Sequence, residues 1–163
     1  MPRGQRCVKH RWVFEIKRDG RFRAHLVACG YSQVAGTDFN EIFSPVANDI
    51  TFRLSLVCMI LHGLDHLIFD VETAFLNGDL EEEICMDCLD GMKHQEDECL
   101  LLKKTICGLV QSARQCCVKF WDVLVDKMKF EQSQSDPCLF MRRNDKGVCF
   151  ILSWRCLLSV SII

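Results

Sequence analysis

A short apolar run that ends in a carboxylate constrains the fold of this chain more than any other stretch. Leu67-Ile68-Phe69 has the length and character of a buried strand, and Asp70 follows it directly. Ligands commonly bind where such a strand ends, so Asp70 is a candidate metal ligand. Asp70, followed by Glu72 and a small-residue turn, would also serve as a helix N-cap. Spacing alone leaves both interpretations open and ranks the cap first.

The composition is that of one globular domain, or of a piece of a larger protein. The chain has 163 residues, of which 49% are hydrophobic and 26% charged, with 3 prolines. A net charge of −2 gives no overall attraction to nucleic acid. The first 25 residues are nevertheless basic, with eight Lys and Arg residues against Glu15 and Asp19. Any contact with a polyanion is expected to start there.

The twelve cysteines raise the question of a secreted, disulfide-bonded scaffold. We expect free thiols instead, because the cysteines lie inside apolar runs and the amino terminus has no apolar signal core. The chain is therefore expected to be intracellular and not secreted. A zinc site built from Cys85, Cys88, Cys99 and Cys107 is a weaker alternative, since a single C-x-x-C is a poor signal. The apolar segment 148–163 is too short for a membrane span.

Alternation and turn residues predict the elements of the first half. Residues 11–17 and 22–28 alternate around the turn Arg18-Asp19-Gly20-Arg21 and predict a β-hairpin with a basic face. Asn48 or Asp49 is expected to cap a helix over 50–61 that ends at His62-Gly63. Because this helix is hydrophobic all round, we expect it to be buried.

The second half predicts short strands around one clear helix. Strands are expected over 84–86 and 100–103, and a helix over 114–130, where apolar residues recur at spacings of three and four. A second hairpin is expected over 138–154, with its turn at Asn144-Asp145-Lys146-Gly147. The acidic stretch 79–83 is expected to be a solvent-exposed surface without a catalytic role. No internal repeat is found, so the prediction is a single α+β unit.

Several blocks, taken together, resemble the reverse transcriptase of copia-type retrotransposons. Their order and spacing match that family across almost the whole chain, and the block at 70–78 is the most specific. The blocks are Trp12-Val13-Phe14, Phe22-Arg23-Ala24-His25-Leu26-Val27-Ala28-Cys29-Gly30-Tyr31-Ser32-Gln33, Phe43-Ser44-Pro45-Val46, Asp70-Val71-Glu72-Thr73-Ala74-Phe75-Leu76-Asn77-Gly78, Gly108-Leu109-Val110-Gln111 and Ser135-Asp136-Pro137-Cys138-Leu139.

The resemblance implies a right-hand polymerase, with residues 1–62 like the fingers and 63–163 like the palm with fingers elements. Such enzymes extend a primer on an RNA or DNA template with deoxynucleotides and two Mg²⁺ ions. Asp70 would be the first carboxylate that binds both ions, and Val71 would offer its carbonyl oxygen. The resemblance assigns nucleotide contacts to Phe75 (below the sugar), Arg23 and His25 (triphosphate and template backbone) and Gly108 (nascent base pair).

The chain departs from the family where the active site should be completed. The family carries Tyr-Val-Asp-Asp on the hairpin after 137–139, but no acidic residue occurs here from Val148 to the end, and Arg155 adds a positive charge. Asp70 without its partner carboxylates would face strong repulsion between two divalent cations. We therefore expect an inactive fragment that lacks the thumb, the ribonuclease H and the integrase of the polyprotein, and that does not enter a membrane.

Two further hypotheses remain from the residues. Cysteines stand where the family usually has arginine or aromatic residues, as at Cys29 and Cys107, so the high cysteine count is expected to record mutational drift; the string after Ser153 suggests a frameshift or truncation. The alternative function is a residual nucleic-acid-binding domain that uses the basic hairpin.

Overall fold

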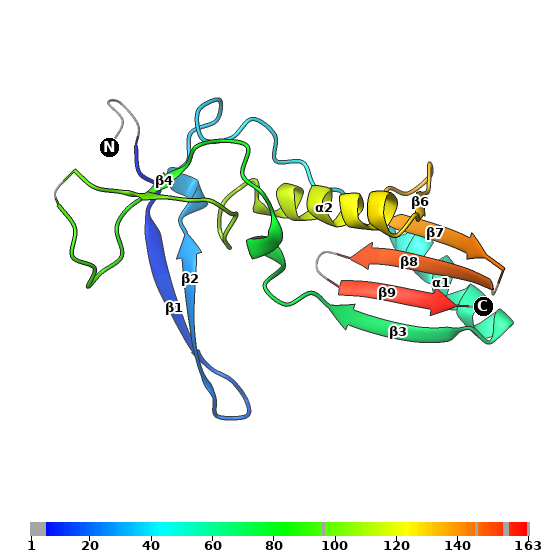
Figure 1. Cartoon of the computed structure of the whole chain (residues 1–163). Coiled ribbons are helices and arrows are strands. Elements are labelled where there is room, and N and C mark those ends of the chain that lie inside the picture. The colour runs from blue at the N-terminus through cyan, green and yellow to red at the C-terminus, as the bar shows by residue number, and fades with distance from the viewer. Residues whose placement is uncertain (1–5, 96, 146, 155–156, 163) are drawn as a thin grey trace. The chain divides into compact units, whose positions relative to one another are not determined.

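The chain forms two compact units, which are described separately. The computed structural model describes residues 6–95, 97–145 and 147–153 in full, and the backbone of 154 and 157–162. The first unit comprises Met1–Phe43 and Phe75–Cys116, and the second comprises Ser44–Ala74 and Cys117–Ile163. Antiparallel strands and few helices make up both units, in agreement with the α+β class (Figure 1).

The predicted basic hairpin is present in the first unit. Strands β1 (His10–Ile16) and β2 (Phe22–Ala28) pair antiparallel, with His10 opposite Ala28 and Ile16 opposite Phe22. Gly20 adopts a φ of 82° in the turn, which a residue without Cβ tolerates best. The side chain of Asp19 stabilises the turn by accepting hydrogen bonds from Arg21, at 3.1 Å from its backbone N and 2.8 Å from its Nε.

Short elements complete the first unit. These are the 3₁₀ helices η1 (Gly30–Ser32) and η2 (Ala74–Asn77), of which Ala74 belongs to the second unit, and the paired strands β4 (Cys85–Met86) and β5 (Leu100–Leu101). Both strands were predicted, although β5 is two residues long where four were expected. The core of this unit consists of buried Val8, Ala28, Ile84 and Leu109.

A five-stranded antiparallel sheet in the order β3-β9-β8-β7-β6 forms most of the second unit (Figure 1). Its strands are β3 (Asp65–Asp70), β6 (Glu131–Gln132), β7 (Leu139–Asn144), β8 (Gly147–Trp154) and β9 (Leu157–Ile162). The hairpin of β7 and β8 was predicted, with Asn144 opposite Gly147. Strand β9 was not predicted, and it lies between β8 and β3.

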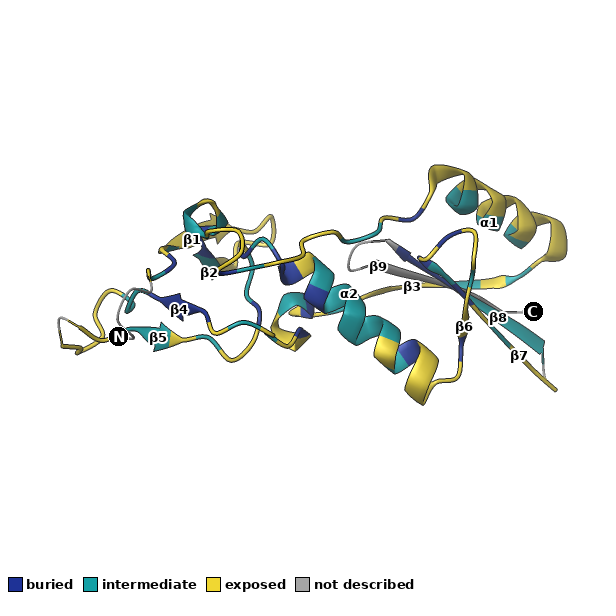
Figure 2. Ribbon diagram, turned by 90° about the horizontal axis from the view of Figure 1, so that it is seen from above, coloured by how far each residue is buried: buried dark blue, intermediate teal, exposed yellow. Residues whose placement is uncertain are grey.

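Helix α1 (Asp49–His62) has the predicted ends but not the predicted burial. The side chain of Asn48 accepts a hydrogen bond from the backbone N of Ile50 at 3.0 Å, and Gly63 ends the helix with a φ of 60°. None of its residues is buried, and Ile60 is 82% exposed (Figure 2). The prediction from hydrophobicity all round the helix was wrong, because Phe52 packs against the core while most of the other apolar side chains remain exposed.

Helix α2 (Ser112–Asp122) ends earlier than its apolar period predicts. Its first residues belong to the first unit, and the second segment of the second unit starts at Cys117. From Val123 to Lys127 the chain continues as a π-helical turn, and Lys129 then adopts a φ of 58°. A π turn rotates the following residues out of the stripe, so Leu124 is buried whereas Met128 is 41% exposed.

Buried Leu124, Phe130, Phe140 and Ile151 form the main core of the second unit. A smaller cluster joins Ala47, Cys138 and Leu152. Beside it, Asp136 is 3% exposed and accepts hydrogen bonds at 2.9 Å from the backbone N of both Asn48 and Cys138. Asp136 thus joins the start of α1 to the turn before β7.

Candidate active site and nucleic-acid interface

Asp70 is the last residue of β3, at an exposed position. The register aligns Asp70 with Leu157, the first residue of β9, which is in turn opposite Trp154, the last residue of β8. The strand was predicted, but the prediction that it is buried was wrong, because Leu67 is 53% exposed and Ile68 is 68% exposed. The Asp70 carboxylate is therefore accessible from solvent.

Asp70 belongs to no metal-holding cluster among the described residues. Its carboxylate makes no hydrogen bond or ion pair with a described residue, and no group of three His, Cys, Asp or Glu side chains able to hold a metal ion is found there. Arg155, which we expected close to this site, lies outside the described residues. One carboxylate and the Val71 carbonyl are too few ligands for two magnesium ions, so the donor set does not fit a two-ion site.

The helix-cap interpretation of Asp70 is not supported by the local backbone. Helix η2 begins at Ala74, four residues after Asp70, and Thr73 adopts a φ of 50° between them. An N-cap residue lies immediately before the first helical residue, so Asp70 does not cap η2.

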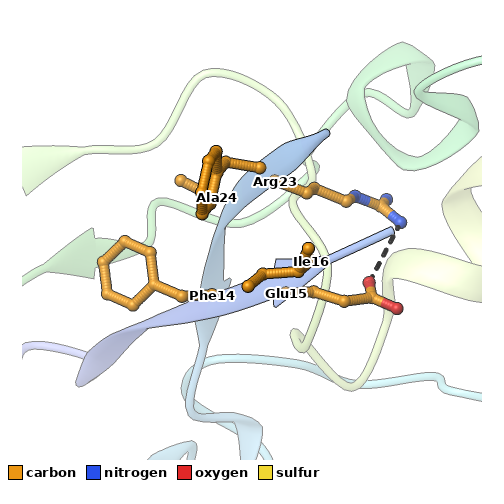
Figure 3. Close-up of a pocket in the computed structure, with 6 residues that line it drawn as sticks. Phe14, Glu15, Ile16, Arg23 and Ala24 are labelled. Atoms are coloured by element: carbon orange, nitrogen blue, oxygen red, sulfur yellow. Dashed lines mark ion pairs between the residues drawn. The ribbon is translucent and has the colours of Figure 1, made fainter. Parts of the chain in front are cut away.

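Arg23 and His25 point to the same face of the hairpin. They are two residues apart in β2 and pair with Glu15 and Val13 of β1, whereas the pair Phe14 and Ala24 lies on the other face. Arg23 and Glu15 form an exposed ion pair of 3.9 Å. Both belong to the lining of an open hollow of about 460 Å³ on the hairpin (Figure 3).

Gly108 lies against the end of β2. Its φ is 96°, and a Cβ at this position would come within 2.1 Å of the Ala28 carbonyl oxygen and 2.6 Å of a methyl group of Val27. The backbone N of Ala28 donates a hydrogen bond of 2.8 Å to the carbonyl of Cys107. Burial raises the pKa of the Cys107 thiol, and the charge of Arg23 opposes this rise. The positive charge of Arg23 therefore acts on the residue next to Gly108.

Phe75 is tied to the segment that leads to Gly108. Its carbonyl accepts a hydrogen bond from the Thr105 hydroxyl, and the backbone N of Thr105 donates one of 3.1 Å to the carbonyl of Gly78. Thr105 is completely buried and Phe75 is half-buried. These bonds hold the chain from Phe75 to Gly78 against the residues that precede Gly108.

Two glutamines that our sequence analysis left without a role organise the same region. Gln111 is completely buried, and its Nε2 donates to the carbonyl of Asp38 at 2.9 Å. The side chain of Gln33 donates to Gln111 Oε1 at 3.0 Å and accepts from the backbone N of Val110 at 2.9 Å. Both glutamines are the last residues of blocks that resemble the family, 22–33 and 108–111, and this shared position was the available signal.

The predicted site residues are thus divided between the two units. Arg23, His25, Phe75 and Gly108 belong to the first unit, and Asp70 and Val71 to the second. The cysteines of the alternative zinc site form no metal-holding group among the described residues. All eleven described cysteines are free thiols. In the described residues, no helix combines the length and the apolar character that a membrane span requires.

Comparison with known proteins decides the family. The family model of the reverse transcriptase (RNA-dependent DNA polymerase) matches residues 1–154. The chain belongs to this reverse transcriptase family. It is 38% identical over 159 residues to the retrovirus-related Pol polyprotein from transposon TNT 1-94 of Nicotiana tabacum, covering 93% of this chain and 12% of the relative.

Two Arabidopsis thaliana relatives are also similar. The Pol polyprotein from transposon RE2 is 34% identical, with 93% of this chain and 11% of the relative covered; that from transposon RE1 is 33% identical, with 87% and 10% covered. The reverse transcriptase chain therefore spans about a tenth of the length of these curated relatives, and it corresponds to the copia-type reverse transcriptase region of a Pol polyprotein. No solved structure matches it.

Proposed function

We propose that this reverse transcriptase region is a fingers-and-palm piece whose family activity, RNA-directed DNA synthesis, is lost. The template-primer and the deoxynucleotide are its expected ligands, and the rest of the polyprotein is its expected partner. The basic hairpin supplies the fingers, and the five-stranded sheet supplies the palm. The assignment of residues 1–62 to the fingers and 63–163 to the palm is part of the proposal.

The register of β3 carries the proposal. Asp70 ends β3 and is aligned with Leu157, directly after the connection from β8 to β9. The family places its acidic pair on the corresponding hairpin, so this connection should supply the carboxylates that share two ions with Asp70. The sequence from Val148 onward has no acidic residue. Asp70 then remains as a single first carboxylate, with Val71 as the adjacent carbonyl ligand.

The electrostatic consequence is large. Two divalent cations about 4 Å apart repel each other strongly, and several carboxylates are needed to offset that repulsion. A single exposed carboxylate in water contributes little by comparison, because exposed charge interactions are worth about 1 kcal/mol or less. Mg²⁺ is therefore expected to bind Asp70 weakly and as a single ion, and no catalytic step is assigned to this site.

A primer-extension assay tests the proposal. The chain, an RNA template, a DNA primer and deoxynucleotides are incubated with Mg²⁺ or Mn²⁺, and the Asp70→Asn and Asp65→Asn variants are run in parallel. Asp65 is the matched control, since it is an exposed aspartate at the other end of β3. We expect no extension from any of the three. Robust synthesis that Asp70→Asn abolishes and Asp65→Asn preserves would overturn the proposed inactivity.

A second candidate function is nucleic-acid binding without catalysis. The hairpin carries Arg11, Lys17, Arg18, Arg21 and Arg23 against Glu15 and Asp19. Arg21 and Arg23 are in ion pairs, whereas Arg11, Lys17 and Arg18 make none with a described residue. Cations of this kind bind phosphates independently of sequence. Fluorescence anisotropy with single-stranded RNA should detect weak binding that falls steeply with salt; binding that is insensitive to salt would exclude this function.

A further inference from the structure

Helix α1 carries an apolar stripe on the side that faces away from the core of the second unit. Ile50, Leu54, Val57 and Leu61 follow one another at spacings of four, three and four residues. At about 100° per residue, these four positions lie within about 60° of one another around the helix axis. Their side chains are 65%, 57%, 49% and 74% exposed, in the same order. We call these four residues the α1 seam, because this spacing is the one by which two helices pack along their length.

A different side of α1 attaches the helix to its own unit. Thr51, Phe52, Ser55 and Met59 are its half-buried residues, and Phe52 packs against the smaller core cluster. Their mean direction is roughly 145° from that of the α1 seam. Figure 2 shows α1 mostly in the yellow of exposed residues, with separate teal patches of intermediate burial. The α1 seam is therefore not used to hold the helix on its sheet, and it is open to another surface.

The α1 seam is complementary to itself. When two copies of α1 pair antiparallel about a two-fold axis, Ile50 meets Leu61 of the second copy, and Leu54 meets Val57. Apolar side chains then face each other along the whole seam, and none of the four positions carries a charge. A second copy of this chain therefore fits the surface without a buried charge or an unpaired polar side chain in the seam.

The charges of α1 favour the same antiparallel arrangement. A helix has a partial positive charge at its N-terminus and a partial negative charge at its C-terminus, so antiparallel helices bring opposite charges together at both ends. A parallel pair would instead bring like ends together, with two Asp49 carboxylates at one of them. Arg53, which lies beside the seam, pairs with Asp49 of its own helix at 2.7 Å. This pairing keeps the guanidinium compensated when a second helix approaches.

We propose that the α1 seam is a self-association surface through which two copies of this chain form an antiparallel dimer. Each copy contributes four seam residues and their flanks, whereas a standard stable interface uses about 20–30 residues a side. The dimer should therefore be weak, with a dissociation constant on the order of 10–100 µM. This surface is independent of the proposed loss of polymerase activity.

The oligomeric state of the full chain in solution tests the proposal. Sedimentation is measured from about 1 µM to about 1 mM, a range that spans the expected dissociation constant. A reducing agent prevents disulfides through Cys58, an exposed thiol of the same helix. The variants are Leu54→Gln and Val57→Gln, because glutamine favours helices and removes the apolar surface. Val57→Gln alone is used if Leu54→Gln loses its far-ultraviolet circular dichroism.

Ile60→Gln is the matched control. Ile60 is an apolar residue of the same helix and is 82% exposed, but it lies about 90° from the α1 seam. The same loss of apolar surface is therefore made outside the proposed contact. A general tendency of the exposed helix to aggregate would respond to all three substitutions alike.

We expect a monomer–dimer equilibrium for the wild type. Each seam variant should weaken it about 100-fold, because a two-fold interface contains every substitution twice and each buried side chain lost is worth at least about tenfold. Ile60→Gln should change the dissociation constant less than about threefold. The proposal is overturned by a monomer at every concentration, by assemblies that grow beyond the dimer, or by an equal effect of Ile60→Gln.

Cross-linking tests the antiparallel orientation. The variants Ile50→Cys and Leu61→Cys are prepared separately, mixed and treated with a short bismaleimide, and the linked peptides are identified by mass spectrometry. We expect a link between positions 50 and 61 of different chains in the mixture, and neither a 50–50 nor a 61–61 link from either variant alone. A 50–50 link, or the absence of the 50–61 link, would overturn the proposed dimer. None of these results depends on primer extension.

Discussion

Gly108→Ala tests whether Gly108 is held by packing in addition to any contact with a nucleotide. Two costs are expected from the structure. A φ of 96° disfavours a residue with Cβ by about 1–2 kcal/mol. The new Cβ would also stand 2.1 Å from the Ala28 carbonyl oxygen, a backbone atom that cannot rotate away.

The second cost follows from how the clash is relieved. The Gly108 loop must move away from β2, and the hydrogen bond from Ala28 to the Cys107 carbonyl is then lost in a buried place. Leaving such groups unpaired costs about 1–3 kcal/mol. The total expected loss in the free energy of unfolding is therefore about 2–5 kcal/mol.

Gly36→Ala is the matched control for this prediction. Gly36 has a φ of 81°, but a Cβ there meets nothing within 4 Å, so only the backbone cost of about 1–2 kcal/mol applies. Urea unfolding gives the stability of each variant, and hydrogen exchange at the Ala28 amide reports the local bond. Equal losses for Gly108→Ala and Gly36→Ala, with Ala28 still protected, would refute the close-packing argument.

Three further predictions concern the buried carboxylate, the hairpin and the Phe75 turn. Asp136→Asn should lower stability by about 2–3 kcal/mol at pH 7. Burial raises the pKa of Asp136, but the hydrogen bonds from Thr51, Asn48 and Cys138 outweigh this effect and lower the pKa below its usual value. The stabilisation by the Asp136 carboxylate is therefore present above about pH 4 and is lost as the pH falls through the folded-state pKa. The urea midpoints of wild type and variant should converge in acid. For RNA binding, the three hairpin cations that form no ion pair with a described residue, Arg11, Lys17 and Arg18, predict a slope of log affinity against log salt of about −2. Lys17→Gln with Arg18→Gln should reduce this slope to about −0.7, measured by anisotropy; an unchanged slope would exclude the hairpin as the binding surface. Thr105→Val should cost about 0.5–1.5 kcal/mol in urea unfolding, because the Phe75 carbonyl loses the bond from the Thr105 hydroxyl and keeps only the 3.3 Å bond from the backbone N of Gly78, whereas an unchanged stability would show that the Thr105 bond is not needed.

The sequence predicted an element well where typical cap or turn residues stand at its ends. Asn48 and Gly63 bound α1, and the Asp19-Gly20 turn joins β1 to β2. Strand β9 was missed because nothing between Trp154 and Leu157 has the Gly, Pro or Asn character of a turn. The end of α2 was misplaced because the apolar period continues through the π turn.

Burial and long-range contacts were predicted less well, for a physical reason. The apolar character of α1 and β3 describes the side chains but not whether another surface covers them, and both remain exposed. The bond between Asp136 and Asn48 joins residues 88 positions apart, and no periodicity reports such a contact. Site roles for Asp70 and Gly108 were predicted from the family resemblance, whereas the buried hydrogen bond from Gln111 to the Asp38 carbonyl was found only in the structure.

The central claim is that Asp70 is a single surviving carboxylate without the ligands for a second ion. Counting bound Mn²⁺ by electron paramagnetic resonance tests it most directly, with template-primer and deoxynucleotide present and with Asp70→Asn and Asp65→Asn as paired variants. We predict at most one weakly bound Mn²⁺ per chain at Asp70, which Asp70→Asn removes and Asp65→Asn keeps. Two tightly bound Mn²⁺ ions per chain, both lost in Asp70→Asn, would contradict the account.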